Sequence, residues 1–330
     1  MRVWYDACTG KHMRYGTAVA RRLRKAGCEV VLTTREHPDT LGVARALGER
    51  PIVIGKYAPF SLSSRVAESA KRTLQFLELF EDNQPDMAIS HQSPELCRTA
   101  FGLNIPIILT ADTPHAIAVN KLTIPLATKL VVSEAIPNRF LKTYCASEIV
   151  QFRGVDEVAW IKGFKPSKTF DFKKPLIVVR QIETNASYAL GETDATLEVA
   201  KKLAGHGTVL FLSRYIKEEI PGLKVVKSFV DSASVVSYAD LVIGAGGTMS
   251  REAALQGVPS IVLSEISRTY VNRYLARKGF PIFFADTSNV YAYTKKYLGK
   301  HVDVKAKLAE LQNPLDLIED LVTKRSPRKD

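Results

Sequence analysis

Short runs of β-branched and aliphatic residues alternate with amphipathic helical stretches along the first half of the chain. A helix that ends in glycine is predicted at 12–27, directly after the first strand. Such alternation is typical of a parallel sheet whose two faces are covered by helices. The strands predicted for this half are 2–6, 29–35, 51–55, 86–90, 106–111 and 128–133.

The alternation breaks at 163–174, where lysines, aromatic residues and prolines follow one another with little periodicity. We expect the interdomain linker there, because 330 residues make a chain that is long for a single hydrophobic core. The pattern then resumes, and the tail from about 314 is predicted to be one more amphipathic helix. The later strands are predicted at 175–180, 208–213, 224–228, 240–246, 259–264 and 282–286.

The two halves together predict an α/β protein of two doubly wound, Rossmann-like domains. The expected boundaries are 1–164 and 165–330, with a final helix that could return to the first domain. Domains of this kind would face each other across a cleft and bind their ligand at the carboxyl ends of their strands. The architecture alone does not identify the ligand, so the motifs at those strand ends have to do so.

A glycine-rich turn at 244–247 follows a buried strand and precedes a helix that begins near Thr248. Glycine lets the backbone approach a phosphate closely, and a helix N-terminus offers free amides and a partial positive charge. The turn therefore predicts a phosphate or diphosphate site. A strand, glycine turn and helix are also common in α/β folds without a ligand, so the turn by itself does not specify a nucleotide.

The longer string at 244–259, GAGGTMSREAALQGVP, resembles the donor motif of GT-B glycosyltransferases and of non-hydrolysing UDP-N-acetylglucosamine 2-epimerases. These families share a glycine pair, an acidic residue on the following helix and a G-x-P exit. The resemblance implies a nucleotide-sugar whose diphosphate lies on the glycines and whose ribose is bound by the acidic residue. The implied donor residues are Gly246, Gly247, Thr248, Met249 and Glu252.

The loop after the first strand reads TGKHMRYGTAVARRL and resembles the start of the N-acetylglucosaminyltransferases that complete lipid II. By that resemblance His12 is a catalytic base or a positioning group near the acceptor, in a cleft loop with Thr9, Gly10 and Lys11. A neutral imidazole at a helix start suits general-base work near neutral pH. The alternative for a lone histidine at this place is a surface residue or a helix cap.

A second loop, at 109–133, resembles the acceptor-binding stretch of the same transferases. It makes Asp112 the second catalytic candidate, with His115 and Asn120 as neighbouring polar groups. His91 ends the preceding predicted strand and is expected at the same edge. Each residue could instead cap a turn or a helix, but several polar groups just after consecutive parallel strands favour a site.

Three further donor-binding candidates follow strands of the second half. Arg180 and Arg214 end two of these strands, where a cation can meet a diphosphate or form a structural ion pair. Phe229 follows another strand, at the place where the backbone of GT-B enzymes usually contacts the base. Over nearly its full length the chain resembles a mainly archaeal family of predicted GT-B glycosyltransferases, including the segment 154–160. The sequence gives no chemical account of this segment, although Asp156 and Glu157 could serve the hinge or the acceptor.

Charge and composition narrow the partners. The net charge of +12 favours anionic ligands, and a basic first helix could hold the protein on an anionic membrane near a lipid-linked acceptor. No apolar run approaches the roughly 20 residues that span a bilayer, and no signal-peptide pattern is seen, so a cytoplasmic protein is expected. No D-x-D or H-E-x-x-H pattern is present, so we expect no metal and no cofactor, the nucleotide-sugar being a substrate.

The sequence thus predicts a metal-independent glycosyltransferase that uses a nucleotide-sugar. A UDP-linked donor is expected and N-acetylglucosamine is one candidate for its sugar, but the sequence identifies neither the sugar nor the acceptor. A 2-epimerase of the same fold is the first alternative, with Asp6, Asp112 and Glu134 as its possible proton carriers. A nucleotide-binding or RNA-binding protein without catalysis is the second, although no RNA-recognition motif accompanies the charge.

Overall fold

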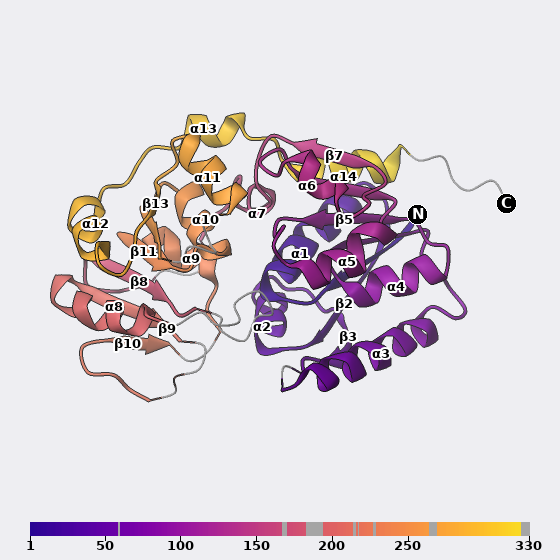
Figure 1. Cartoon of the computed structure of the whole chain (residues 1–330), viewed down its shortest axis with the longest axis horizontal. Coiled ribbons are helices and arrows are strands. Elements are labelled where there is room, and N and C mark those ends of the chain that lie inside the picture. Colours follow the sequence, from indigo (N-terminus) through magenta and orange to yellow (C-terminus); the bar gives the residue numbers. More distant parts are fainter. Residues whose placement is uncertain are drawn as a thin grey trace. The chain divides into compact units, whose positions relative to one another are not determined.

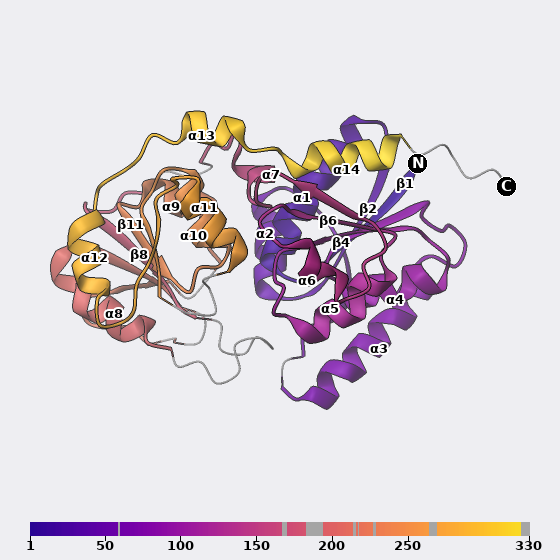
Figure 2. The ribbon, with the colours of Figure 1, turned by 45° about the horizontal axis from the view of Figure 1, so that its top comes forward.

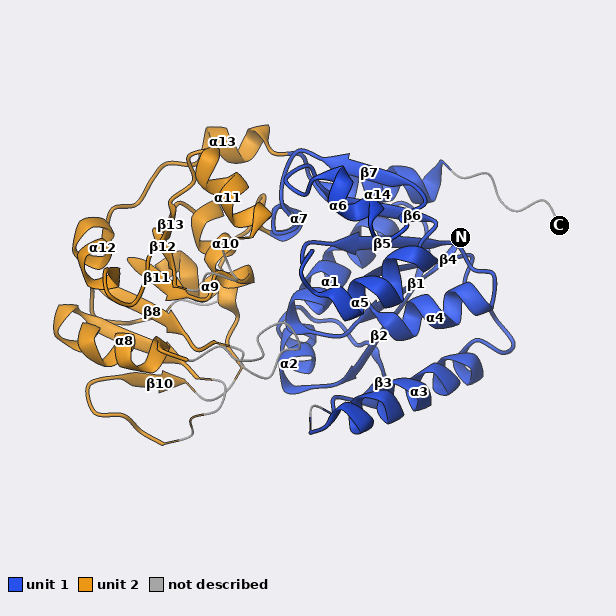
Figure 3. Cartoon of the chain, viewed as in Figure 1, with its two compact units in different colours: residues 1–160, 312–330 blue, residues 161–311 orange. Residues whose placement is uncertain are grey.

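The computed structural model describes residues 1–58, 60–166, 170–182, 194–213, 216, 218–226, 229–263 and 269–324. Internal contacts divide the chain into two compact units (Figure 3). Unit 1 comprises Met1–Trp160 and Gln312–Asp330, and unit 2 comprises Ile161–Leu311. The chain therefore leaves unit 1 four residues earlier than the expected boundary at 164, and it returns to unit 1 at Gln312.

The described part of unit 1 contains a seven-stranded parallel sheet in the order β3-β2-β1-β4-β5-β6-β7. Because β1 lies between β2 and β4, the winding of the chain reverses there, which is the place where doubly wound sheets bind ligands. The strands are β1 (Arg2–Ala7), β2 (Glu29–Glu36), β3 (Ile52–Lys56), β4 (Met87–His91), β5 (Ile107–Ala111), β6 (Lys129–Ser133) and β7 (Ile149–Phe152).

Helices cover both faces of this sheet (Figure 1). They are α1 (Gly10–Lys25), α2 (Pro38–Ala46), α3 (Leu62–Leu79), α4 (Pro94–Gly102), α5 (Ile117–Thr123), the 3-10 turn Ile124–Leu126, α6 (Asn138–Lys142), α7 (Val158–Ile161) and α14 (Pro314–Thr323). Every residue of β4 and β5 is buried, as expected for central strands of a sheet covered on both faces. On one face Trp4 packs against Phe76 and Phe80, with ring centroids 4.7 Å from each.

The final helix, α14, packs along α1 (Figure 2). Arg22 of α1 is 2.7 Å from Asp316 and 2.5 Å from Glu319 of α14. Arg21 and Arg24 pair with Glu49 at 3.5 and 2.9 Å. The sequence suggested a basic face on the first helix for an anionic membrane. That expectation is weakened, because the arginines of this face are neutralised by carboxylates of the same unit.

The described part of unit 2 contains a six-stranded parallel sheet in the order β10-β9-β8-β11-β12-β13. Its strands are β8 (Leu176–Arg180), β9 (Thr208–Leu212), β10 (Lys224–Val226), β11 (Leu241–Gly244), β12 (Ser260–Val262) and β13 (Ile282–Phe284). Its helices are α8 (Thr196–Leu203), the 3-10 turn Ala204–His206, α9 (Ser232–Tyr238), α10 (Thr248–Leu255), α11 (Tyr270–Arg277), α12 (Val290–Tyr297) and α13 (Lys305–Glu310). Both units are thus doubly wound α/β structures, which confirms the predicted fold class.

None of the helices in the described residues is long and apolar enough to cross a membrane.

Candidate functional site

The polar residues predicted for the first half gather at the carboxyl edge of the unit 1 sheet. Strands β1, β4 and β5 are neighbours in that sheet, and the loops or residues at their ends carry His12, His91 and Asp112. Because the carboxyl ends of parallel strands meet at one edge, residues about a hundred positions apart in the sequence are brought together. The structure therefore brings these three predicted residues to one edge of the sheet.

His12 lies in the first turn of α1. Thr9 caps this helix, and its side chain accepts a hydrogen bond from the backbone amide of His12 at 3.3 Å. The His12 ring meets the His91 ring edge-on, with centroids 4.8 Å apart. Its Nδ1 is buried and has no hydrogen-bond partner among the described residues. Burial, and then the nearness of His91 and Lys11, lowers the pKa of His12 well below 6.5, so the imidazole is neutral at neutral pH.

Asp112 is surrounded by hydrogen-bond donors. Its Oδ2 accepts from Lys11 Nζ at 2.5 Å, and its Oδ1 accepts from Thr113 at 2.8 Å and lies 3.2 Å from His91 Nε2. The other ring nitrogen of His91, Nδ1, lies 2.8 Å from Thr110 Oγ1. Both carboxylate oxygens of Asp112 are thus engaged, which favours a role in holding its neighbours over a role as the base.

Two more acidic residues belong to this cluster, for which the sequence left a role at the hinge or the acceptor open. Asp156 and Glu157, in the segment after β7, place their carboxylates 2.8 and 3.9 Å from Lys11 Nζ. Their side chains are only 2% and 1% exposed. The one sequence signal was a pair of acidic residues flanked by Val155 and Val158, because carboxylates inside an apolar segment are rarely buried without a partner.

Two buried phenols border the same cluster. The hydroxyls of Tyr5 and Tyr15 have no hydrogen-bond partner among the described residues. Burial, and then the negative charge of Asp156, raises the pKa of both phenols well above 10. The Tyr5 ring lies against Gly16 of α1, where a Cβ would stand 2.3 Å from its Cε1. The glycine in the TGKHMRYG string is therefore required by the close approach of this ring.

Carboxylates and imidazole are also metal ligands, and the sequence analysis expected no metal. The structure does bring potential ligand atoms of His91, Asp112 and Asp156 within 4.8 Å of one another. However, the Lys11 ammonium contacts both carboxylates, and a metal ion would have to displace it. We therefore interpret the three residues as part of an ion-pair network that already contains its own cation.

A second buried ion-pair network lies at the end of β1. Arg72 of α3 donates to both oxygens of Asp6, at 2.6 and 3.0 Å, and contacts Glu95 at 3.3 Å. Burial, and then the charge of Asp6, raises the pKa of the adjacent Cys8 thiol to about 12. Cys8 is thus a protonated, unreactive thiol at neutral pH. Asp6, considered above as a proton carrier of an epimerase, is committed to Arg72.

Three other residues named from the sequence follow β5 and β6. The Asn120 side chain is buried and donates to the carbonyls of Thr113 and Pro114, at 3.2 and 2.8 Å. It therefore stabilises the turn that follows Asp112, and its place at the cleft stays a prediction. His115 is exposed in the same turn, and Glu134 is exposed after β6.

The glycine motif of unit 2 has the predicted local structure. β11 ends at Gly244, Gly246 has a φ of 74°, and Gly247 precedes α10 without a side-chain hydrogen bond to cap the helix. Two residues not singled out from the sequence hold the turn: Asn272 of α11 donates to the Gly246 carbonyl at 2.7 Å, and Arg251 approaches it at 3.5 Å. The backbone amides at the start of α10, which no side chain caps, can donate hydrogen bonds to an anion.

The other donor candidates are placed differently. Glu252 is fully buried, and Met249 packs on the core of unit 2, which leaves only its backbone for a phosphate. Thr248 and Phe229 are half-buried. Arg180 ends β8 beside Gly244, where a Cβ on that glycine would stand 3.4 Å from the arginine Cβ. Arg214 lies outside the described residues.

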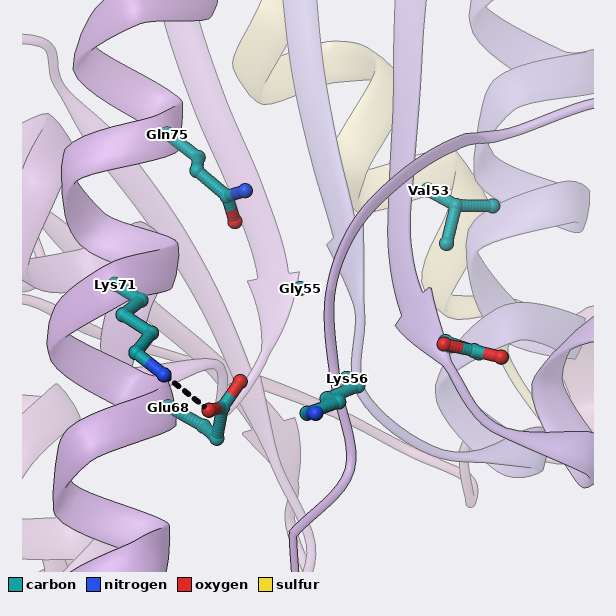
Figure 4. Close-up of a pocket in the computed structure, with 7 residues that line it drawn as sticks. Val53, Gly55, Lys56, Glu68, Lys71 and Gln75 are labelled. Atoms are coloured by element: carbon teal, nitrogen blue, oxygen red, sulfur yellow. Dashed lines mark hydrogen bonds and ion pairs between the residues drawn. The ribbon is translucent and has the colours of Figure 1, made fainter.

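A surface hollow of about 370 Å³ lies elsewhere on unit 1, between β3 and α3 (Figure 4). Lys71 and Glu68, neighbours on α3, pair with each other at 2.8 Å in the wall of this hollow. None of the site residues predicted from the sequence lines this hollow. Its lining residues are Glu36, Val53, Gly55, Lys56, Glu68, Lys71 and Gln75.

Two doubly wound units, one with a glycine turn that opens a helix, define a protein of the GT-B fold. Solved structures agree with this class over the full chain. The UDP-GlcNAc 2-epimerase of Methanocaldococcus jannaschii, in complex with UDP-GlcNAc and UDP, is 13% identical with a TM-score of 0.72 and covers 98% of this chain and 100% of its own. The glycosyltransferase SnogD from Streptomyces nogalater is 15% identical with a TM-score of 0.60 and covers 98% of each chain.

The sequence comparison specifies the family. Residues 1–326 match the family described as "Protein of unknown function (DUF354)", and the chain belongs to that family. It is 32% identical over 338 residues to "Uncharacterized protein MJ0665" of Methanocaldococcus jannaschii, covering 97% of both chains.

Proposed function

We propose that this protein is a metal-independent glycosyltransferase in which His12 is the catalytic base. The observation that carries the proposal is the state of His12: a neutral imidazole at the carboxyl edge of the unit 1 sheet, whose Nδ1 has no partner among the described residues. A group that must take a proton near pH 7 needs a neutral, unoccupied nitrogen. His91 and Asp112, the polar groups beside it, are engaged with Thr110, Thr113 and Lys11.

Unit 2 would bind the donor, a nucleotide-sugar. The glycine turn and the uncapped start of α10 supply amides for a diphosphate, and Arg180 ends the strand beside that turn. UDP-N-acetylglucosamine is the first donor to test, because the similar Methanocaldococcus jannaschii structure is described with UDP-GlcNAc and UDP. The acceptor would be a hydroxyl compound, and a lipid-linked one is the first candidate.

In the reaction, His12 takes the proton of the acceptor hydroxyl while the acceptor oxygen forms a bond to the anomeric carbon. The bond from that carbon to the diphosphate oxygen breaks on the opposite face, so the configuration is inverted. The electron pair leaves with UDP, whose added negative charge is stabilised by the amides at the start of α10. Asp112 holds Lys11 and His91 beside the base and does not itself carry the proton.

A 2-epimerase is the second candidate, because Asp112, Asp156 and Glu157 lie together in unit 1 and epimerisation needs groups that remove and return a proton. We favour transfer because all three of these carboxylates lie within 4 Å of the Lys11 ammonium and are already engaged in ion pairs with it. Asp6 is likewise committed to Arg72.

Labelled UDP-N-acetylglucosamine separates these functions when it is incubated with the protein, with and without a membrane lipid extract. Transfer predicts UDP release and label in the lipid fraction only when the extract is present. A new sugar stereoisomer in the absence of an acceptor would instead establish the epimerase. Titration calorimetry with UDP tests the donor site separately, and a protein that binds no nucleotide or nucleotide-sugar would overturn both proposals.

A further inference from the structure

Lys11 is the central cation of the unit 1 site. Its ammonium lies 2.5 Å from Asp112, 2.8 Å from Asp156 and 3.9 Å from Glu157, and its side chain is only 12% exposed. The three carboxylates come from two separate places, the residue after β5 and the segment after β7. Losing one partner of an ion pair this far removed from water is costly, because it leaves an uncompensated buried charge.

The segment that carries Asp156 is firmly fixed within unit 1. Val155 and Val158, on either side of the acidic pair, are fully buried. The Gly154 carbonyl accepts from Ser133 at 2.5 Å, and a Cβ on Gly154 would stand 2.7 Å from the Gln312 carbonyl. The Gln312 amide in turn donates to the Arg153 carbonyl at 2.7 Å. Asp156 is therefore a fixed anchor, and Lys11 is the side chain that reaches it.

Lys11 directly precedes His12 in the first turn of α1. The ion pairs of Lys11 therefore tie that turn to Asp112 and Asp156. Asp112 also lies 3.2 Å from Nε2 of His91, and Asp156 lies 3.8 Å from Nδ1 of the same ring. His91 is the ring that meets His12 edge-on. Both sides of the His12–His91 contact are thus held by the same two carboxylates.

We propose that Lys11 and Asp156 are positioning residues, whose ion pair holds the first turn of α1 so that the His12 imidazole is oriented for proton abstraction. The inference rests on the proposed function in one respect, because it takes His12 to be the base that removes the proton of the acceptor hydroxyl. It also assigns a role to the segment 154–160, which supplies the anchor of the site.

Lys11 acts on His12 through its charge as well as through the ion pairs that hold the first turn of α1. Burial and His91 come first among the causes that lower the pKa of His12, and Lys11 follows. Asp112 acts in the opposite direction, and Arg35 adds a small lowering. Removing the Lys11 charge should therefore raise the His12 pKa, whereas an arginine at this position should keep it low.

The test is NMR of protein with isotope-labelled histidine, which needs no substrate. The His12 signals are assigned by their loss in His12→Asn. In Lys11→Met we expect the midpoint of the His12 titration to rise by on the order of one pH unit, and the cross-relaxation between the His12 and His91 rings to weaken. Lys11→Arg should keep the low midpoint, and Asp156→Asn should weaken the ring contact. Lys25→Met, which removes the same charge from the other end of α1, should change neither signal.

Wild-type midpoints and ring contacts in both Lys11→Met and Asp156→Asn would overturn the proposal. If circular dichroism shows that Lys11→Met does not fold, Lys11→Arg and Asp156→Asn decide it. Once turnover is measurable, Lys11→Met should lower kcat more than donor affinity. A wild-type protein without turnover would refute the proposed function, whereas an unchanged His12 signal in the variants would refute this inference alone.

Discussion

The two candidate binding regions of this protein are built in opposite ways. In unit 1 the site consists of side chains: one lysine, two histidines and three carboxylates that come from α1, β4, the end of β5 and the segment after β7. In unit 2 it consists mainly of backbone: a glycine turn at the end of β11 and the first amides of α10. The first is a buried network of charges, and the second is a short contiguous stretch of chain.

The difference matters because the two constructions tolerate different changes. A side-chain network depends on the identity and charge of each member, since a buried charge without a partner is costly. A backbone site depends on the conformation that the chain can adopt, and is less sensitive to side chains that point elsewhere. Substitutions that remove a functional group should therefore impair the unit 1 site, and substitutions that add a Cβ to the glycine turn should impair the unit 2 site.

The largest expected effect is that of His12→Ala on turnover. Loss of the general base should lower kcat by roughly 10²–10⁴-fold, whereas the affinity for UDP should stay as in the wild type, because the proposed donor site lies in unit 2. Steady-state kinetics and calorimetry measure the two quantities separately. His301→Ala, an imidazole on unit 2 that lies by Asp240, serves as the control and should retain wild-type turnover. Equal losses of turnover and UDP affinity would contradict the assignment of the catalytic base to unit 1 and of donor binding to unit 2.

Gly16→Ala should destabilise the protein without any charge being altered. The new Cβ would lie 2.3 Å from the Tyr5 ring, which is itself buried in the sheet. Overpacking of this kind costs about 1–3 kcal/mol in the free energy of unfolding. Gly102→Ala in α4 is the matched control, because its Cβ would meet only the flexible end of Arg98 at 2.8 Å. Denaturant unfolding of the two variants gives the comparison, and equal stabilities would refute the close packing of Tyr5 on α1.

The sequence alone predicted much of the fold and part of the sites, for physical reasons that differ between the units. Strand β1 and the glycine turn could be read locally, because a short strand-like run and a glycine-rich turn leave a signal in neighbouring residues. His12 and Asp112 were predicted from the resemblance of their loops to the lipid II-forming transferases. His91 was predicted from its place at the end of a neighbouring strand.

The ion-pair partners could not be read in this way. Lys11 meets Asp156 across 145 positions, and Asp6 meets Arg72 across 66. Nothing in the local pattern around Asp156 specifies its partner, since the choice is made by tertiary packing of β7 and the segment after it. The same holds for Asn272, which reaches the Gly246 carbonyl from a different helix.

Gly246→Ala tests the backbone character of the unit 2 motif. Gly246 has a φ of 74°, a conformation that costs a residue with a Cβ about 1–2 kcal/mol. If the turn holds the diphosphate, UDP affinity should fall by roughly 5–30-fold, and His12 should keep its NMR titration because unit 1 is unaltered. Gly205→Ala is the control, since nothing lies within 4 Å of its Cβ position. Unchanged UDP binding in calorimetry would remove this turn from the donor site.

The smallest expected effect is the dependence of stability on pH, and it should also distinguish the two units. The folded protein keeps His12 neutral, with a pKa well below the 6.5 of an unfolded histidine. As pH falls below 6.5, the unfolded chain therefore binds a proton that the folded chain does not, and stability is lost by at most about 1.4 kcal/mol per pH unit for one such group. Above pH 6.5 neither the folded nor the unfolded chain protonates His12, so no stability is lost.

Hydrogen exchange at pH 5.0 and 7.5, controlled for the intrinsic rate, should show unit 1 losing protection at the lower pH. His12→Asn should abolish that part of the difference, because asparagine does not titrate, and a loss of equal size in unit 2 would show that the buried charges of unit 1 are not its cause.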